Sequence, residues 1–284
     1  MKTLITLTFS CLFTVALAQN GEFHLDKEYQ INKTGTLDLS SSDGKVFITG
    51  SSRTNVHVKI DRRITSKGLG WGGEDFTVEV TENNGDIKIR ERQSGGNVSV
   101  GYYHEEYRIE IAAPEGISLT VRGDDGDYYI KNINGNIQMS LDDADAELSG
   151  CKGKDFSFRI DDGDIRMDGG NGNLEVIADD ADVEISNATF RSIEANVDDG
   201  DLIIETSLVD QGQYYFESQD GLISLNITKG GGEFDIRHDD GHVTTDSNFK
   251  VLNESDDRTT VTLAQGSARV KVRADDARVK LSTK

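Results

Sequence analysis

One acidic motif of four residues recurs along the second half of the chain and constrains the fold more than any other feature. Its first copy is Asp124-Asp125-Gly126-Asp127, and the next four copies begin at residues 142, 161, 179 and 198. A repeat of 18 or 19 residues is typical of proteins in which each unit stacks on the next one. The chain is therefore predicted to be a repeat protein.

Apolar and polar side chains alternate on both sides of each copy. Phe156, Phe158 and Ile160 precede the third copy, for example, with one polar residue between each pair. A period of two indicates β-strands, because successive side chains of a strand point to opposite faces. A turn rich in glycine and asparagine, such as residues 171–173, separates consecutive units. Each unit is thus predicted to be a strand, an acidic turn, a second strand and a glycine turn.

Two all-β architectures have this unit. Hairpins of an antiparallel sandwich have no reason to keep chemically identical turns. A solenoid stacks equivalent corners about 4.8 Å apart, so it favours identical turns. We therefore predict an all-β fold, a parallel β-helix or β-solenoid.

The third position of the motif alternates between glycine, at 126, 163 and 200, and alanine, at 144 and 181. Identical residues thus recur every 37 residues. If stacking enforces likeness, one coil holds two units, and the glycine and alanine corners form separate columns; one unit per coil is the alternative. The two corner types are expected to differ in backbone geometry, because glycine adopts positive φ where alanine is strained.

Weaker copies of the motif occur outside the regular array. They lie at residues 42–45, 219–221, 238–242 and 274–277. The segment 19–117 is rich in alternating residues but less regular. We predict it to be an irregular N-terminal part or cap of the solenoid, and residues 118–284 to be the solenoid repeats. Trp71, the only tryptophan, is expected to cover the solenoid end, with an exposed contact residue as the alternative.

The first 18 residues resemble a signal peptide. Lys2 supplies the positive start, an apolar run covers residues 4–17, and Ala16-Leu17-Ala18 has the small residues of a cleavage site. An uncleaved anchor and a lipidated Cys11 are the alternatives. No second apolar run follows, so no membrane span is expected after cleavage. The protein is predicted to be exported by this signal, to the periplasm, the outer surface or the medium.

The formal net charge is −21, and removing Lys2 with the signal makes it −22. Nucleic acid is excluded as a partner, because its binding depends on cationic contacts to phosphate. Cations or a basic partner are the natural counterparts. Cleavage also leaves one cysteine, Cys151, which cannot form an intramolecular disulfide and is expected to be a small buried residue.

Residues 107–150 resemble a known bacterial family. The matching segments are the strand 107–116, which ends in Pro114-Glu115-Gly116, then 119–127, and the Gly/Asn turn at 133–137. They are similar to the putative-adhesin family of bacterial β-strand-repeat domains of unknown function. The resemblance covers about residues 35–284 and implies an exported right-handed β-solenoid. It brings no catalytic residues, and the doubled aspartate departs from the family pattern.

The five strong copies carry fifteen aspartates. These are Asp124, Asp125, Asp127, Asp142, Asp143, Asp145, Asp161, Asp162, Asp164, Asp179, Asp180, Asp182, Asp198, Asp199 and Asp201. Carboxylates stacked about 4.8 Å apart repel each other by about 1 kcal/mol per pair in water. Hydrogen bonds from backbone N–H groups to turn aspartates are one way to offset this repulsion. The other is calcium, which takes six to eight oxygen ligands and is the only possible cofactor. The calcium nonapeptide motif itself fails, because Leu174 occupies the ligand position after the glycines at 169–173.

One segment is compatible with catalysis. His238-Asp239-Asp240-Gly241-His242 places two acids beside two histidines, and paired carboxylates hydrolyse glycosides. The acids, however, are already explained by the repeat. His238 is predicted to point inward and His242 to lie on the surface, with no catalytic residue assigned.

Together these observations predict an exported, non-enzymatic protein of the cell envelope or surface. It is expected to be an adhesin-like scaffold that presents an acidic repeat face to an unknown protein or glycan at the cell surface. The alternatives are a calcium-dependent binding module and a carbohydrate-active β-helix enzyme.

Overall fold

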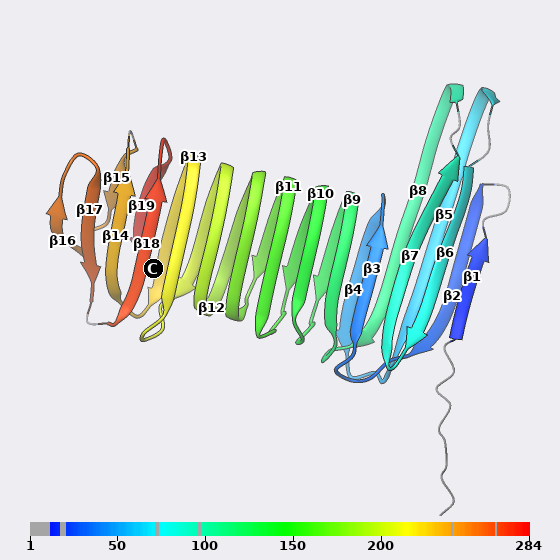
Figure 1. Ribbon diagram of the computed structural model, residues 1–284, viewed down its shortest axis with the longest axis horizontal. Coiled ribbons are helices and arrows are strands. Elements are labelled where there is room, and N and C mark those ends of the chain that lie inside the picture. Colours follow the sequence, from blue (N-terminus) through cyan, green and yellow to red (C-terminus); the bar gives the residue numbers. More distant parts are fainter. Residues whose placement is uncertain (1–11, 18–20, 72–73, 96–97, 240, 265) are drawn as a thin grey trace, which may run out of the picture.

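The computed structural model describes residues 12–17, 21–71, 74–95, 98–239, 241–264 and 266–284. These residues form nineteen strands, and no helix occurs among them. It follows that no described segment is a helix able to cross a membrane. The strands form one elongated stack (Figure 1). The all-β class predicted from the alternation is confirmed.

The middle of the stack consists of strands that pair in parallel. They are β9 (Ser118–Lys131), β10 (Ile137–Ser149), β11 (Asp155–Asp168), β12 (Asn171–Ser207) and β13 (Gln213–Lys229). Each pairs in parallel with the next one, on both sides of an acidic corner; β12 contains two corners and pairs with β11 around the first and with β13 around the second. This open, parallel arrangement agrees with stacked coils rather than antiparallel hairpins. Its handedness stays a prediction.

The register between coils corrects the expectation of two units per coil. Asp143 lies opposite Asp125 on one side and Asp162 on the other, and Asp162 lies opposite Asp180. One coil therefore contains one unit, and glycine and alanine corners alternate in a single column. The prediction was wrong because stacking does not require an identical residue at the third position.

The core lies between the two strand layers of the coils. Met139, Phe158 and Val176 are neighbours in register on successive strands, and all three are buried. Burial of such side chains stabilises the fold by about 1.5–3 kcal/mol each. Cys151 is buried as predicted, and this burial raises the pKa of its thiol.

The first coil in the sequence does not lie at the end of the stack. It consists of β3 (Thr36–Ser41) and β4 (Lys45–Ser51), both of which pair in parallel with β9. On their other side they pair in parallel with β7 (Asp86–Gly95) and β8 (Val98–Pro114). This coil thus joins the parallel stack although it belongs to the predicted N-terminal part, and the division at residue 118 stays a prediction.

Beyond this coil the pairing becomes antiparallel in both layers. One layer continues from β8 to β5 (Asn55–Trp71) and β2 (Glu22–Gln30). The other continues from β7 to β6 (Glu74–Asn83) and β1 (Leu12–Leu17). We call these strands the antiparallel end.

Two predictions concern parts of this end that the structure does not fully describe. Residues 1–11 and 18–20 lie outside the described residues, and 12–17 form β1, so the signal peptide stays a prediction. Trp71 ends β5 opposite Val98, but its side chain is not described. Its proposed role as a cap therefore stays a prediction as well.

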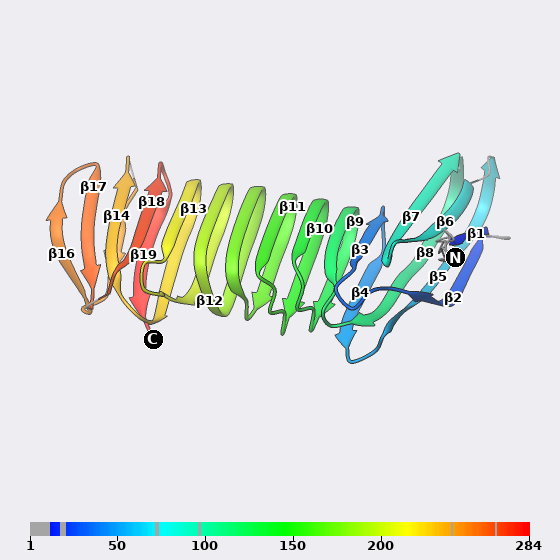
Figure 2. The ribbon, with the colours of Figure 1, turned by 60° about the horizontal axis from the view of Figure 1, so that its bottom comes forward.

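At the opposite end the order of strands in space also differs from their order in the sequence. The last coil, β18 (Ala268–Ala274) and β19 (Arg278–Thr283), lies between β13 and the coil formed by β14 (Gly232–His238) and β15 (Val243–Thr245) (Figure 2). A hairpin of two antiparallel strands follows beside β14. It consists of β17 (Arg258–Leu263) and β16 (Phe249–Glu254).

Candidate functional site

The acidic motifs form one continuous column of corners, and the weaker copies belong to it. The amide N–H groups of Asp125 and Asp127 donate to the carbonyls of Ser42 and Gly44 at 2.8 and 3.0 Å. At the other end the copies at 219–221, 274–277 and 238–242 lie next to one another through similar bonds. We call this series, from 42–45 to 238–242, the corner column.

Glycine and alanine corners differ in backbone geometry, as expected. Gly126, Gly163 and Gly200 have φ values of 129°, 115° and 140°, whereas Ala144 and Ala181 are not in the left-handed region. A Cβ added to Gly163 would lie 2.5 Å from the carbonyl oxygen of Ala144. The alanine methyl groups are instead buried. Close approach of successive corners therefore requires glycine at every second step of the regular array, and at its two ends glycine follows glycine, as Gly126 follows Gly44 and Gly221 follows Gly200.

Fourth-position aspartates hold neighbouring corners together. The backbone N–H of Asp164 donates to Asp145 Oδ1 at 2.9 Å, and that of Asp201 donates to Asp182 Oδ1 at 2.8 Å. The predicted bonds from backbone N–H groups to turn aspartates therefore exist. Their donors lie in the next coil rather than in the same turn, so they join coils as well as satisfy a turn.

First- and second-position aspartates meet other carboxyl groups. A hydrogen bond with Asp161 is the largest cause that raises the pKa of Asp142. A hydrogen bond with Asp143 does the same for the pKa of Asp162. A hydrogen bond between two carboxyl groups requires a proton on one of them, so these pairs favour protonation.

Carboxyl pKa values are also raised by neighbouring aspartates at both ends of the regular array. The pKa of Asp199 is raised by loss of solvation and then by the charge of Asp220. The pKa of Asp43 is raised by loss of solvation and then by Asp125. Among the described residues, no cation forms an ion pair with Asp43, Asp142, Asp162 or Asp199.

Three cations of the described residues do reach the column. Lys45 Nζ lies 3.1 Å from Asp127, Arg166 lies 2.5 Å from Asp164, and Arg273 lies 3.8 Å from Asp275. All fifteen aspartates proposed as calcium ligands lie on the column. Among the described residues, however, no group of three or more His, Cys, Asp or Glu side chains is placed to hold a metal ion. Calcium binding stays a prediction.

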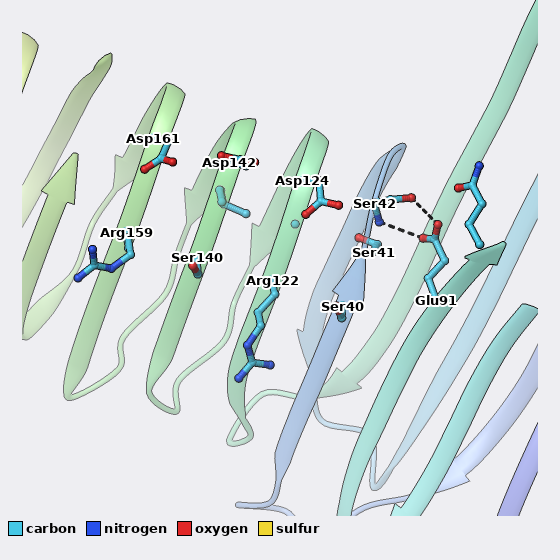
Figure 3. A pocket seen from close by; sticks show the side chains of 13 residues that line it. Ser40, Ser41, Ser42, Glu91, Arg122, Asp124, Ser140, Asp142, Arg159 and Asp161 are labelled. Atoms are coloured by element: carbon cyan, nitrogen blue, oxygen red, sulfur yellow. Dashed lines mark hydrogen bonds between the residues drawn. The ribbon is translucent and has the colours of Figure 1, made fainter. Parts of the chain in front are cut away.

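A groove of about 540 Å³ runs beside the first-position aspartates, where the stack meets β7. In Figure 3, Asp124, Asp142 and Asp161 follow one another on successive strands, and Arg122 and Arg159 lie on the same face. The groove therefore combines a row of carboxylates with guanidinium groups. Such a surface is suited to polar ligands rather than to apolar ones.

Glu91 anchors the end of this groove, and sequence reasoning missed it. Its carboxylate accepts hydrogen bonds from the backbone N–H of Ser42 at 3.1 Å, from the Ser42 hydroxyl, and from the Tyr107 hydroxyl at 2.9 Å (Figure 3 shows the Ser42 bonds). Glu91 lies in the irregular part of the sequence, where no repeat points to it. Ser42 becomes its neighbour only when β3 packs against β7, and Tyr107 reaches it from β8.

The segment considered for catalysis forms the last corner of the column. His238 is partly buried, and its Nε2 lies 3.2 Å from the Thr259 hydroxyl. His242 is exposed. Both positions agree with the predictions, and Asp240 lies outside the described residues.

Several solved structures resemble the chain at low sequence identity. A putative adhesin from Bacteroides fragilis is 12% identical, with a TM-score of 0.51, over 91% of this chain and 96% of that one. A putative adhesin from Parabacteroides merdae is 8% identical, with a TM-score of 0.40, over 91% and 95%. A putative lipid binding protein from Parabacteroides distasonis is 10% identical, with a TM-score of 0.41, over 91% and 96%. The first likeness concerns the fold alone, and none of the three is named as an enzyme.

No curated protein matches the chain. A protein-family model matches the chain over residues 36–282. This span begins at β3, the first strand of the parallel stack, and ends in β19. The resemblance seen in the sequence is confirmed: the chain belongs to the Toastrack DUF4097 family.

Proposed function

We propose that the protein is an exported, non-enzymatic scaffold with an adhesin-like role, which presents the corner column to a partner at the cell envelope. The observation that carries this proposal is the continuity of the column. Exposed aspartates of successive coils lie in register along one edge of the stack. A partner with cationic groups at a matching spacing then meets many carboxylates at once.

The proposal predicts that adhesion depends on where the negative charge lies. Bacteria that display the full chain should adhere to surfaces coated with envelope material more than cells without it. A triple variant of first-position aspartates removes three charges from the column: Asp142→Asn, Asp161→Asn and Asp179→Asn. This variant should lose most of the added adhesion.

A matched control removes the same charge from the outward faces of the strands. It combines Glu147→Gln, Glu184→Gln and Glu194→Gln, three exposed glutamates away from the corners. This control should adhere like the wild type. Equal loss in both triple variants would show that net charge, not the column, causes adhesion. Absence of added adhesion in the wild type would refute the adhesive role.

A calcium-dependent binding module is the second candidate function. It is favoured by the carboxyl pairs Asp142–Asp161 and Asp143–Asp162, which hydrogen-bond across neighbouring corners and have no ion pair with a cation in the described part of the chain. Calcium between such pairs would replace the shared proton and join two coils. The melting temperature should then rise when calcium is added and fall again with EDTA. An unchanged melting temperature in both conditions would rule out this second function.

A further inference from the structure

The last coil reverses the charge of the chain. Residues 268–284 contain six Lys or Arg and two Asp, a formal charge of +4, whereas the whole chain has −21. This coil lies between β13 and β14 rather than at the tip of the stack. The average charge of the protein therefore conceals a region with the opposite sign.

Three arginines lie side by side on the outer surface of this region. Arg273 on β18 lies opposite Arg237 on β14, and Arg237 lies opposite Arg258 on β17. All three side chains are exposed. We call this set the arginine row. Neighbouring strands lie about 4.8 Å apart, so the row crosses three strands over roughly 10 Å.

Such an arrangement is unfavourable for the fold alone, because like charges directly opposite each other destabilise a sheet. Arg258 is held by Asp235 through two hydrogen bonds of 2.6 and 3.0 Å. Arg273 has looser ion pairs, with Glu217 at 3.3 Å and Asp275 at 3.8 Å. Arg237, the middle residue of the row, thus forms no ion pair with any of these three acids.

Arg237 itself has no ion-pair partner among the described residues, although the chain has 51 acids for 30 Lys and Arg. Lys271 and Arg269 lie two and four residues before Arg273 on the same exposed face of β18. Glu233 and Asp235 lie opposite Arg269 and Lys271 on β14, but neither Arg269 nor Lys271 forms an ion pair within 4.0 Å in the described part of the chain. The arginine row and these two residues form a narrow track that carries five cations against three acids on the same face, Glu217, Glu233 and Asp235.

We propose that the arginine row binds the anionic groups of an acidic polysaccharide. A guanidinium presents a planar fork of donors that fits carboxylate, sulfate or phosphate oxygens. A linear chain can follow a track that is one side chain wide. A flat anionic membrane would also meet the exposed Asp275 and Asp276 beside the row, so it fits less well. This inference goes beyond the proposed function, which places its partner at the corner column.

Dextran sulfate is a suitable probe, titrated into the full chain at about 50 mM NaCl, where charge contacts are strong. The wild type should bind it, and binding should weaken as salt increases. Arg237→Ser should weaken binding by at least about tenfold, the effect of losing one charge-assisted hydrogen bond. Lys271→Ser should cause a smaller loss. Arg63→Ser, an exposed arginine at the antiparallel end, is the matched control and should bind normally.

The melting temperature separates a binding role from a structural one. Because Arg237→Ser relieves like-charge contact, it should melt at the wild-type temperature or slightly above while it loses binding. Normal binding by Arg237→Ser, or an equal loss in Arg63→Ser, would overturn the proposal. So would absence of wild-type binding. Binding of anionic phospholipid vesicles in place of dextran sulfate would overturn the polysaccharide as the ligand.

Discussion

The corner column and the antiparallel end contain the same residue type in opposite electrostatic situations. In the corner column, parallel strands in register place Asp next to Asp, and the pKa values of Asp142 and Asp162 are raised. At the antiparallel end, strand β2 runs against β5, and unlike residues face each other. A hydrogen bond from His57, at 2.7 Å, is the largest cause that lowers the pKa of Asp26.

Asp61, also at the antiparallel end, differs from the corner aspartates in the same way as Asp26. Loss of solvation alone would raise its pKa, but hydrogen bonds from His24, at 2.6 Å, and Lys59 outweigh it, so the pKa is lowered. Asp38 lies on β3, which pairs in parallel with β7 and β9, and its pKa is lowered too: loss of solvation would raise it, but Arg90 and Arg122 outweigh this effect. Strand direction alone therefore does not decide whether an aspartate meets another aspartate or a cation. Identical units stacked in register place Asp beside Asp, whereas neighbouring strands of unlike sequence, parallel or antiparallel, place a cation beside it.

The largest effect on the free energy of unfolding is expected from a substitution that disturbs the close packing of successive corners, a packing that the antiparallel end lacks. Gly163→Ala should destabilise the fold by about 2–5 kcal/mol, because positive φ strains alanine and its methyl group would clash with the Ala144 carbonyl. Gly169 also has positive φ, of 97°, but open space around it. Gly169→Ala should therefore cost only about 1–2 kcal/mol. Urea denaturation of the two variants measures the difference, and equal values would refute the close packing of corners.

A moderate effect is expected from pH, with opposite signs for the corner aspartates and for the aspartates that lie beside cations. Corner aspartates with a raised pKa stabilise the folded state fully when the pH lies below their unfolded pKa, near 3.8. This stabilisation is lost as the pH rises through their pKa in the folded protein. Asp26, Asp38 and Asp61, with lowered pKa, stabilise the fold above 3.8 and lose this as pH falls through their folded values. The melting temperature should thus rise from pH 7 toward about pH 4 and fall below that. A steady fall from pH 7 downward would contradict the repulsion in the column.

Much of the fold follows from local patterns. Alternation at Phe156, Phe158 and Ile160 predicts a strand with an inward face, and the recurring motif predicts a column of corners. The number of units per coil did not follow from the repeat. An alanine methyl at 144 turns into the core, while glycine at 163 avoids a carbonyl, so the two residues serve the same column for different reasons.

Other features depend on long-range order that no local pattern contains. The motif at 274–277 indicates a corner, but not that its coil inserts between β13 and β14. Glu91 becomes an anchor only because β7 lies beside β3. The arginine row also did not follow from the composition, because a strongly negative net charge predicts only cationic partners.

The central claim is that identical units stacked in register raise the pKa of their aspartates, whereas unlike neighbouring strands lower it. Carbon-detected NMR titration of individual carboxyl groups tests this claim most directly. The account predicts pKa values above 3.8 for Asp142 and Asp162, in the corner column, and below 3.8 for Asp26 and Asp61, at the antiparallel end. Titration of all four groups at a common value, or corner values below 3.8, would contradict it.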